Sequence, residues 1–524
     1  MSLSTIQPAC IRHTELPGTS RLFSDFAYHF DRVQGFYGFD PHNPASLNSA
    51  ASQIQFPDER RAALISALRG QNGESESLAR LARPGTVAVV TGQQVGLFSG
   101  PAYTVYKAIT AAKLARQLSE SGIPAVPLFW LASEDHDFAE VNHAWVFNSS
   151  SHATVLRVEA PKEIAGRQRP VGNLPVARPP IEELRSALQG MPFAAEVMEA
   201  VEEAYAPGAS MTSGFRTLLR RLTSSLSLLF LDPLDPAIRQ IGAPFLAKAL
   251  AQAPELKAAL MERNRELVSK GYHAQVHVDP KTSLFFLLEN GERVTLRRKD
   301  SEFADLANRA QDVSPNALLR PVWQDYLLPT IAYIGGPGEL AYLAQSSVIY
   351  ERLLGRMPVA MSRSAFTLLD GRSAKLLDRY GLTVTQTFAY KDALKERIAR
   401  ALVPESLSHS LEAISADVAR QMDRLKSDLD GFDHTLAAAT EKSRAKILYQ
   451  LEKIRRKTGR ETMRRDTRAT EDAQHLSNLL FPHRHLQERF YSILPFLAQH
   501  GLDLVDRLYG TVELDCPDHR VFSV

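Results

Sequence analysis

Three polar segments of the sequence carry residue types that could bind a ligand, and two of them are rich in glycine. The first is the segment 91–103, TGQQVGLFSGPAY. Its glycines let the backbone approach a ligand closely, and the free N–H groups at the start of a following helix attract phosphate. On that helix Tyr103 and Lys107 would share one face. The segment has neither a Walker A nor a GxGxxG pattern, so a purely structural turn explains it equally well.

The second segment, residues 130–140 (WLASEDHDFAE), crowds carboxylates around one histidine. Such a cluster suits the binding of a substrate amine, general base catalysis by His136, or a magnesium ion held partly by carboxylates. On a solvated loop the same residues would merely cap the next helix, but their expected position beside the first segment favours a function. The candidates here are Glu134, Asp135, His136 and Asp137.

The third segment, residues 334–342 (IGGPGELAY), again combines glycines with a proline. These residues allow close backbone approach to a ligand, and Glu339 and Tyr342 stand three apart at an expected helix start. Three upstream residues at helical spacing could flank the segment or could be ordinary helix surface: Asn316, Arg320 and Gln324.

Each of the three segments follows an apolar run that reads as a strand, namely 86–92, 123–131 and 329–336. Strands that are apolar throughout belong in a parallel sheet covered on both faces, and ligands bind at the carboxyl edge of such sheets. Two further strands are expected at 226–233 and 356–364. The wide spacing of the strands predicts a Rossmann-like core interrupted by long insertions, with a nucleotide-and-substrate crevice at one edge.

A different pattern, of long helices, begins near residue 390. Apolar residues from Ile414 to Leu436 alternate steps of three and four, and the pattern resumes from Ile447 to Ile454. This 3.5-residue period predicts a coiled-coil hairpin or a dimer seam, with a bundle packed on its own core as the alternative. The basic excess of 442–468 is better explained as a solvated helix face than as a nucleic-acid site, because no aromatic residues that could stack on bases interrupt it.

The expected organisation therefore has four parts. Residues 1–85 form a mostly helical lead-in packed on the core, and 86–388 form the core, with insertions at about 150–220 and 265–315. Residues 389–472 form the coiled-coil domain, and 473–524 form a C-terminal helical segment packed on the body.

Composition limits the class of protein. The 524 residues include 61 Lys+Arg and 59 Asp+Glu, a formal net charge of +2, so a chain that coats nucleic acid or anionic membrane is not expected. Two cysteines, Cys10 and Cys516, exclude a disulfide scaffold and a cysteine-based zinc site. The N-terminus does not look like a signal peptide, and no apolar run is long enough to span a membrane. We expect a cytoplasmic protein.

The motifs of the three segments are similar to those of a known family. TGQQVGLFSGPAYTVYKAITAAKLA, VPLFWLASEDHDFAEVNHAWV and LLPTIAYIGGPGELAYLAQ resemble the BshC family, the cysteine ligases of bacillithiol biosynthesis, and the likeness extends to the late motif FPHRHLQERFYS. The resemblance implies a core of the nucleotidyltransferase type found in class I aminoacyl-tRNA synthetases, with connecting-peptide insertions and a coiled coil that forms a homodimer. It also implies that L-cysteine is joined to glucosaminyl-malate (GlcN-Mal), and by analogy with that superfamily ATP, with magnesium, would first activate the cysteine carboxylate as an adenylate.

The resemblance also suggests roles for the candidate residues. The backbone of Gly96, Ser99 and Gly100, with Lys107, would stabilise charge on the α-phosphate. His136, with Asp135 or Asp137, would hold the cysteine ammonium or deprotonate the glucosamine amine. Gly335, Gly336 and Gly338 would cradle adenosine. The remaining candidates would contact substrate or ribose: Gln93, Gln94, Tyr103, Glu134, Glu339 and Tyr342.

The sequence departs from the synthetase signatures in three ways. HIGH is absent as such, and KMSKS has only a loose echo in 361–364, where Arg363 could meet phosphate. The two distant cysteines offer no counterpart of the zinc site found in some synthetases, so we expect no zinc. Two alternatives stay open: an aminoacyl-adenylate-forming amide ligase with another amine acceptor, and a non-catalytic nucleotide-binding coiled-coil scaffold.

Overall fold

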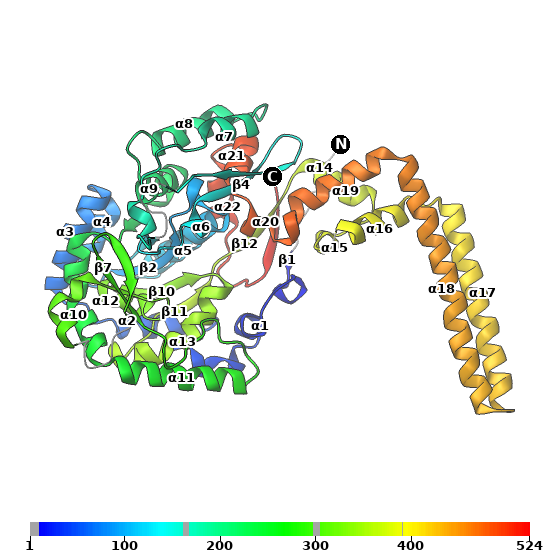
Figure 1. Ribbon diagram of the computed structural model, residues 1–524, viewed down its shortest axis with the longest axis horizontal. Helices are drawn as coiled ribbons and strands as arrows, with labels where there is room; N and C mark the ends of the chain where they lie inside the picture. Colours follow the sequence, from blue (N-terminus) through cyan, green and yellow to red (C-terminus); the bar gives the residue numbers. More distant parts are fainter. Residues whose placement is uncertain (1–9, 161–166, 297–303, 390) are drawn as a thin grey trace. The chain divides into compact units, whose positions relative to one another are not determined.

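The computed structural model describes residues 10–160, 167–296, 304–389 and 391–524 (Figure 1). The chain divides into two compact units. The first comprises residues within 1–149, 153–367 and 488–522, and the second comprises 150–152, 368–487 and 523–524.

A five-stranded sheet forms the centre of the first unit. Its strand order is β11-β10-β2-β3-β6, and every pairing is parallel. The predicted Rossmann-like parallel sheet is thereby confirmed. The strands are β2 (Val87–Gln94), β3 (Ala125–Ala132), β6 (Leu229–Leu231), β10 (Thr330–Gly335) and β11 (Val359–Ser362).

The chain order of these strands creates a switch point between β2 and β10. From β2 the chain runs through α5 (Tyr103–Glu120) to β3 and then outward to β6, whereas β10, α13 (Pro337–Leu353) and β11 lie on the other side of β2. At such a reversal the connecting helices diverge and leave a crevice at the carboxyl ends of the strands. The carboxyl ends of β2 and β10 therefore border the same space.

The sheet is apolar because both of its faces are covered. Val87 and Val89 of β2 pack in a cluster with the buried side of α5, while Ala88 and Val90 face a larger cluster on the opposite side. Helices from the insertions and from the N-terminal segment complete that larger cluster: α1 (Arg21–Tyr28), α3 (Asp58–Asn72), α4 (Glu76–Leu81), α10 (Pro236–Ala251), α11 (Ala253–Ser269) and α12 (Arg320–Leu327).

Two long insertions interrupt the parallel sheet. The first, between β3 and β6, holds α6 (Phe138–Val141), the antiparallel pair β4 (His143–Phe147) and β5 (Ala153–Arg157), and the helices α7 (Ile181–Ala187), α8 (Ala194–Ala204) and α9 (Met211–Leu222). The second, between β6 and β10, holds α10 and α11 and an antiparallel sheet in the order β8-β7-β9, formed by β7 (Phe285–Glu289), β8 (Glu292–Thr295) and β9 (Val313–Pro315).

The two ends of the chain meet in the first unit. The short strand β1 (Cys10–Ile11) pairs antiparallel with β13 (His519–Ser523). Before β13 the chain forms α20 (Gln487–Phe490), α21 (Leu494–His500) and α22 (Leu504–Thr511). The helix α2 (Ala45–Ser52) packs on the same face of the central sheet as α5.

The second unit contains the coiled coil that the apolar pattern predicts. Its α17 (Glu405–Asp430) and α18 (His434–Arg465) run side by side as a long hairpin (Figure 1), and the interruption of the pattern near Gly431 is the turn between them. Basic residues of 442–468 pair with neighbouring helices: Arg444 with Asp423 at 3.0 Å and Arg455 with Glu412 at 3.1 Å.

This unit begins earlier than the boundary at 389 expected from the sequence. The helices α14 (Gly371–Arg379) and α15 (Val384–Thr387) contact α19 (Thr467–Leu480), and the hydroxyl of Tyr380 donates to Asp472 at 2.8 Å. These contacts join α14 and α15 to the helical unit, which α16 (Lys391–Ala401) completes. In the part of the chain that the structure describes, no helix is long and apolar enough to cross a membrane.

Candidate active site

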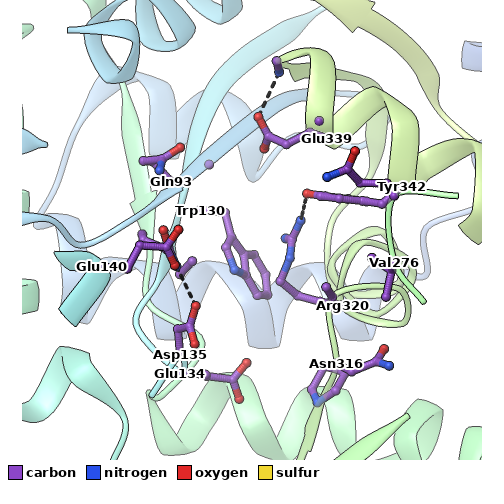
Figure 2. A pocket seen from close by; sticks show the side chains of 18 of the residues that line it. Gln93, Trp130, Glu134, Asp135, Glu140, Val276, Asn316, Arg320, Glu339 and Tyr342 are labelled. Carbon is purple, nitrogen blue, oxygen red and sulfur yellow. Dashed lines mark hydrogen bonds between the residues drawn. The ribbon is translucent and has the colours of Figure 1, made fainter. Parts of the chain in front are cut away.

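A cavity of about 610 Å³ lies at the carboxyl edge of the central sheet. The end of β2, the start of α5, the loop after β3 and the turn from β10 into α13 form part of its wall, together with β7, β8, the start of α12, and Arg363 and Arg489. Figure 2 shows the indole of Trp130 between two groups of side chains. Glu134, Asp135 and Glu140 lie on one side, and Arg320, Asn316 and Tyr342 lie on the other.

Most of the residues that the sequence singled out border this cavity. They are Gln93, Gln94, Tyr103, Lys107, Glu134, Asp135, His136, Gly336, Gly338, Glu339 and Tyr342. The three segments therefore converge at the edge of the sheet, as their position after apolar strands indicated.

The buried Lys107 of α5 forms an ion pair with the partly buried Glu339 at the start of α13, beside the end of β2. The Lys107 ammonium also donates to the Gly92 carbonyl at 2.8 Å and to Gln93 Oε1 at 2.9 Å, which uses its three protons. Glu339 accepts from the Gly336 N–H at 2.9 Å and from the Tyr333 hydroxyl at 2.7 Å. Its carboxylate thus occupies the place at the start of α13 where a phosphate could bind.

Burial and the partner's charge shift the pKa values of this pair in opposite directions. Burial alone would raise the pKa of Glu339, but the Lys107 charge and the Gly336 N–H outweigh it and hold that pKa below its usual range. Burial lowers the pKa of Lys107, although Glu339 opposes the shift. Both effects follow from the same geometry, in which two opposite charges share a site with little water.

One glutamine, Gln94, donates hydrogen bonds to two carboxylates of the acidic segment. Gln94 Nε2 donates to Asp135 Oδ2 and to Glu140 Oε2, each at 2.7 Å. Burial would raise the pKa of Asp135, but the Gln94 hydrogen bond and the Arg293 charge keep it below its usual range. Asp135 is therefore ionised at neutral pH and faces the cavity as an acceptor.

Two other acids of this segment have structural partners. Glu134 is buried and pairs with Arg239 at 2.6 Å. Asp137 does not border the cavity; it is exposed and caps α6 by accepting from the Glu140 N–H at 3.2 Å. The helix-cap role that the sequence left as an alternative thus describes the placement of Asp137.

His136 is held by a residue that sequence reasoning missed. The guanidinium of Arg293 approaches His136 Nδ1 at 3.1 Å, and its other nitrogens donate to Ser314 Oγ and the Pro315 carbonyl. Because arginine only donates, Nδ1 must accept, so the proton of the neutral ring is on Nε2. Burial, followed by the Arg293 charge, lowers the pKa of His136. His136 therefore presents a hydrogen-bond donor at neutral pH.

Three cations surround the ring of Tyr103. Lys107, Arg363 and Arg489 lie 5.7, 5.2 and 5.8 Å from its centroid. Arg363 is buried and bonded through two nitrogens to Glu488, at 2.9 and 2.6 Å. Arg489 is exposed and forms no ion pair with any described residue. Its guanidinium is thus available to an anionic group of a ligand.

Arg320 lies in the wall of the cavity opposite the acidic segment. Its Nη2 donates to the Tyr342 hydroxyl at 3.2 Å and its Nη1 to Gln324 Oε1 at 2.9 Å. Asn316 borders the cavity, but its Oδ1 accepts from the N–H groups of Leu318 and Leu319 and so fixes the turn into α12. Gln324 is buried behind Arg320 and does not border the cavity.

The glycine turn after β2 lies inside the protein. Phe98, Ser99 and Gly100 have φ angles of 52°, 65° and 65°, and the Phe98 N–H donates to the Tyr205 hydroxyl at 2.8 Å. Gly96, Ser99 and Gly100 are buried and do not border the cavity. The structure therefore separates these three from Lys107, with which a phosphate role had been expected. Gly335 is also buried; its carbonyl accepts from the Arg363 N–H at 2.9 Å.

Arg293 and Arg489 were missed because they come from segments without a local signal. Arg293 lies in a four-residue strand of an insertion, and Arg489 lies in a helix of four residues near the C-terminus. Only the motif FPHRHLQERFYS, which contains Arg489, could have pointed to the second of them. Among the described residues, no group of three or more His, Cys, Asp and Glu side chains could hold a metal ion.

Known proteins match both units. Residues 9–364 match the family model described as bacillithiol biosynthesis BshC, N-terminal Rossmann-like domain, and residues 366–524 match the BshC C-terminal coiled-coil domain. A relative from Solibacter usitatus is 54% identical over 98% of this chain and 99% of its own length. Relatives from Koribacter versatilis and Salinibacter ruber are 37% and 33% identical; the alignments cover 99% and 96% of this chain and 100% and 96% of theirs. Each carries the name "Putative cysteine ligase BshC".

Proposed function

The chain belongs to the BshC family, which confirms the resemblance of its motifs, and from this premise we propose that it is a ligase that joins L-cysteine to the amine of GlcN-Mal with ATP-dependent activation of the cysteine carboxylate. One observation carries the proposal. A single cavity at the switch point of the sheet combines carboxylates on one wall with arginines on the others. Such a cavity suits substrates that bring both an amine and anionic groups.

The cationic walls supply the contacts for anions. Arg489 has no anionic partner of its own among the described residues, and the buried indole N–H of Trp130 has no hydrogen-bond partner. These two unsatisfied donors fit a nucleotide, whose phosphates would meet Arg489 and Arg363 and whose base would lie near Trp130. ATP would supply the leaving group on the cysteine carboxylate. Magnesium would arrive bound to the phosphates, because carboxylate cages are not its usual site in such enzymes.

The roles of the acidic segment follow from its hydrogen bonds. Asp135, ionised and fixed by Gln94, would hold an ammonium group of a substrate. Glu140 is the exposed carboxylate beside it and would take the proton of the attacking amine. His136 donates through Nε2, so its role is to orient a carboxylate or phosphate oxygen rather than to act as a base.

The direct test is a reconstitution with purified protein. Incubation with L-cysteine, GlcN-Mal and magnesium-ATP should yield the cysteinyl amide and one nucleotide product, AMP or ADP, both identified by mass spectrometry. Omission of each substrate in turn is the control. An amide formed with another amine, together with cysteine-dependent pyrophosphate exchange, would favour the alternative amide ligase. Absence of ATP and GlcN-Mal binding in calorimetry would favour the scaffold.

We propose in addition that the protein is a homodimer formed through its coiled coil. Apolar side chains on α17, on α18 and in the turn between them are left two-fifths or more exposed: Ile414, Leu425, Phe432, Leu436, Ile447 and Ile454. A second copy would cover them. Sedimentation equilibrium should give twice the monomer mass, and Ile414→Asp with Ile447→Asp should give the monomer. We place the enzyme in the cytoplasm, where ATP and cysteine are available, with neither nucleic acid nor membrane as a partner.

A further inference from the structure

The two cysteines of the chain stand at its opposite ends in sequence and side by side in the structure. Cys10 begins β1, which is paired with β13 so that Cys10 lies opposite Arg520 and Ile11 opposite His519. Cys516 lies just before β13 in the same arm of the chain. The two thiols are in hydrogen-bonding contact. Two thiols in contact are close enough for one sulfur to attack the other once that sulfur is part of a mixed disulfide.

The pair is accessible from solution. Cys10 is exposed and Cys516 is partly exposed, so small molecules in solution can reach them. The guanidinium of Arg520 bonds to the sulfur of Cys516 and is itself held by an ion pair with Glu513. Burial, followed by the neighbouring Cys516, raises the pKa of the Cys10 thiol although the Arg520 charge opposes the shift. Attack by Cys10 therefore proceeds through a small fraction of thiolate, the nucleophilic form of cysteine.

We propose that Cys10 and Cys516 are a redox-active dithiol, a modification site for low-molecular-weight disulfides. One thiolate attacks a sulfur of the disulfide RSSR, forms a mixed disulfide and releases RS⁻. The second thiolate then attacks the protein sulfur of that mixed disulfide and releases the second RS⁻. The two protons of the protein thiols pass to the released thiolates. The net reaction oxidises the protein dithiol to an intramolecular disulfide and reduces RSSR to two RSH.

The disulfide would fasten the two ends of the chain together. β1 has only two residues, so its two backbone pairings with β13 are a weak attachment. A covalent link between Cys10 and Cys516 closes a loop of nearly the whole chain and restricts the unfolded state. The oxidised protein should therefore unfold at a higher temperature than the reduced protein. The exchange uses no residue of the cavity and does not depend on the ligase reaction.

Mass spectrometry of the full chain tests the proposal. The reduced protein is freed of reductant, incubated with cystine, and then alkylated under denaturing conditions. The wild type should lose the mass of two hydrogen atoms, take up no alkyl group and yield a crosslinked peptide pair containing Cys10 and Cys516; dithiothreitol should reverse the change. Cys10→Ser and Cys516→Ser should instead accumulate one half-cystine adduct each. The Tm of the wild type should rise by several degrees on oxidation, and that of either variant should stay within one degree (about the effect expected of a surface substitution).

Two results would overturn the proposal. The first is a wild type that accumulates half-cystine adducts on both cysteines, which would mean that the thiols cannot reach each other. The second is a product linked between two chains, visible as a dimer on a non-reducing gel. An oxidised wild type with an unchanged Tm would show that the bond forms without securing β1, against the stated consequence.

Discussion

The ammonium group of Lys107 is paired with the carboxylate of Glu339, although the two residues come from different βα units of the sheet. Lys107 is almost fully buried, and Glu339 keeps 19% of its side chain exposed. Removal of one partner from such a pair leaves an uncompensated charge in a poorly solvated place. The pair therefore joins α5 to the start of α13, and both of its charges lie in the wall of the cavity.

This pairing predicts how stability depends on Lys107. Lys107→Met should lower the free energy of unfolding by about 3 kcal/mol, because Glu339 would remain without its cation. The double variant Lys107→Met/Glu339→Gln should recover part of that loss, since its second change removes the uncompensated charge. Urea denaturation at neutral pH measures both. The single variant Glu339→Gln completes the comparison. If the double variant loses as much free energy of unfolding as the two single variants lose together, the two side chains do not interact.

The same pair predicts a pH dependence. The folded pKa of Glu339 lies below the ordinary value of 4.5, so its contribution to stability is fully present above that value and is lost as the pH falls through the folded pKa. The difference in the free energy of unfolding between wild type and Glu339→Gln should thus shrink as the pH is lowered from 6 to about 3. Urea denaturation across this range provides the measurement. A difference that grows toward acid pH would mean that the folded pKa is raised.

Arg293 is predicted to set the proton position on His136. Arg293→Met should remove the donor to Nδ1, raise the pKa of His136 and allow the other tautomer, because the second largest cause of the lowered pKa would be gone. Nitrogen NMR of the imidazole should show the change directly. Activity should fall roughly 10- to 100-fold, the size of effect known for the loss of a hydrogen-bond partner of a metal-bound histidine. Arg309→Met, at an exposed arginine of the same insertion, is the matched control. An unchanged tautomer in Arg293→Met would exclude this role.

Features whose signal lies within one short segment of the chain could be placed from the sequence. The three polar segments could be placed at one sheet edge because each follows an apolar strand, and the turn at Gly431 because the 3.5-residue pattern breaks there. The contacts of Arg293, Arg489 and Cys516 could not be predicted, because each is brought to its partner by distant segments. For the turn after β2 the sequence left a phosphate-binding loop and a structural turn equally open. The structure buries this turn, and Phe98 and Ser99, which are not glycines, adopt the left-handed conformation there.

Arg489 is predicted to act in ligand binding and not in stability. Arg489→Ala should raise the KM for the anionic substrate that it contacts by roughly 10-fold, the effect of losing one charge-assisted hydrogen bond. Its Tm should stay within about 1 °C of wild type, since the side chain is exposed and has no carboxylate partner among the described residues. Arg489→Lys should restore part of the binding, and Arg507→Ala, at an exposed position of α22, is the control. An unchanged KM for both ATP and GlcN-Mal would remove Arg489 from the site.

Gly459 is predicted to be required where α18 crosses α16 within the helical unit. A Cβ atom at this position would lie 2.8 Å from the Ala399 carbonyl oxygen and 3.0 Å from its carbon, so the two backbones would have to separate. In an exposed helix, Gly→Ala stabilises by about 1 kcal/mol, but here the clash should reverse the sign and destabilise the unit by about 1–2 kcal/mol. Ser443→Ala, at an exposed position of the same helix, isolates the effect of helix propensity. Thermal unfolding followed by circular dichroism compares the two, and a stabilised Gly459→Ala would show that α16 and α18 do not approach this closely.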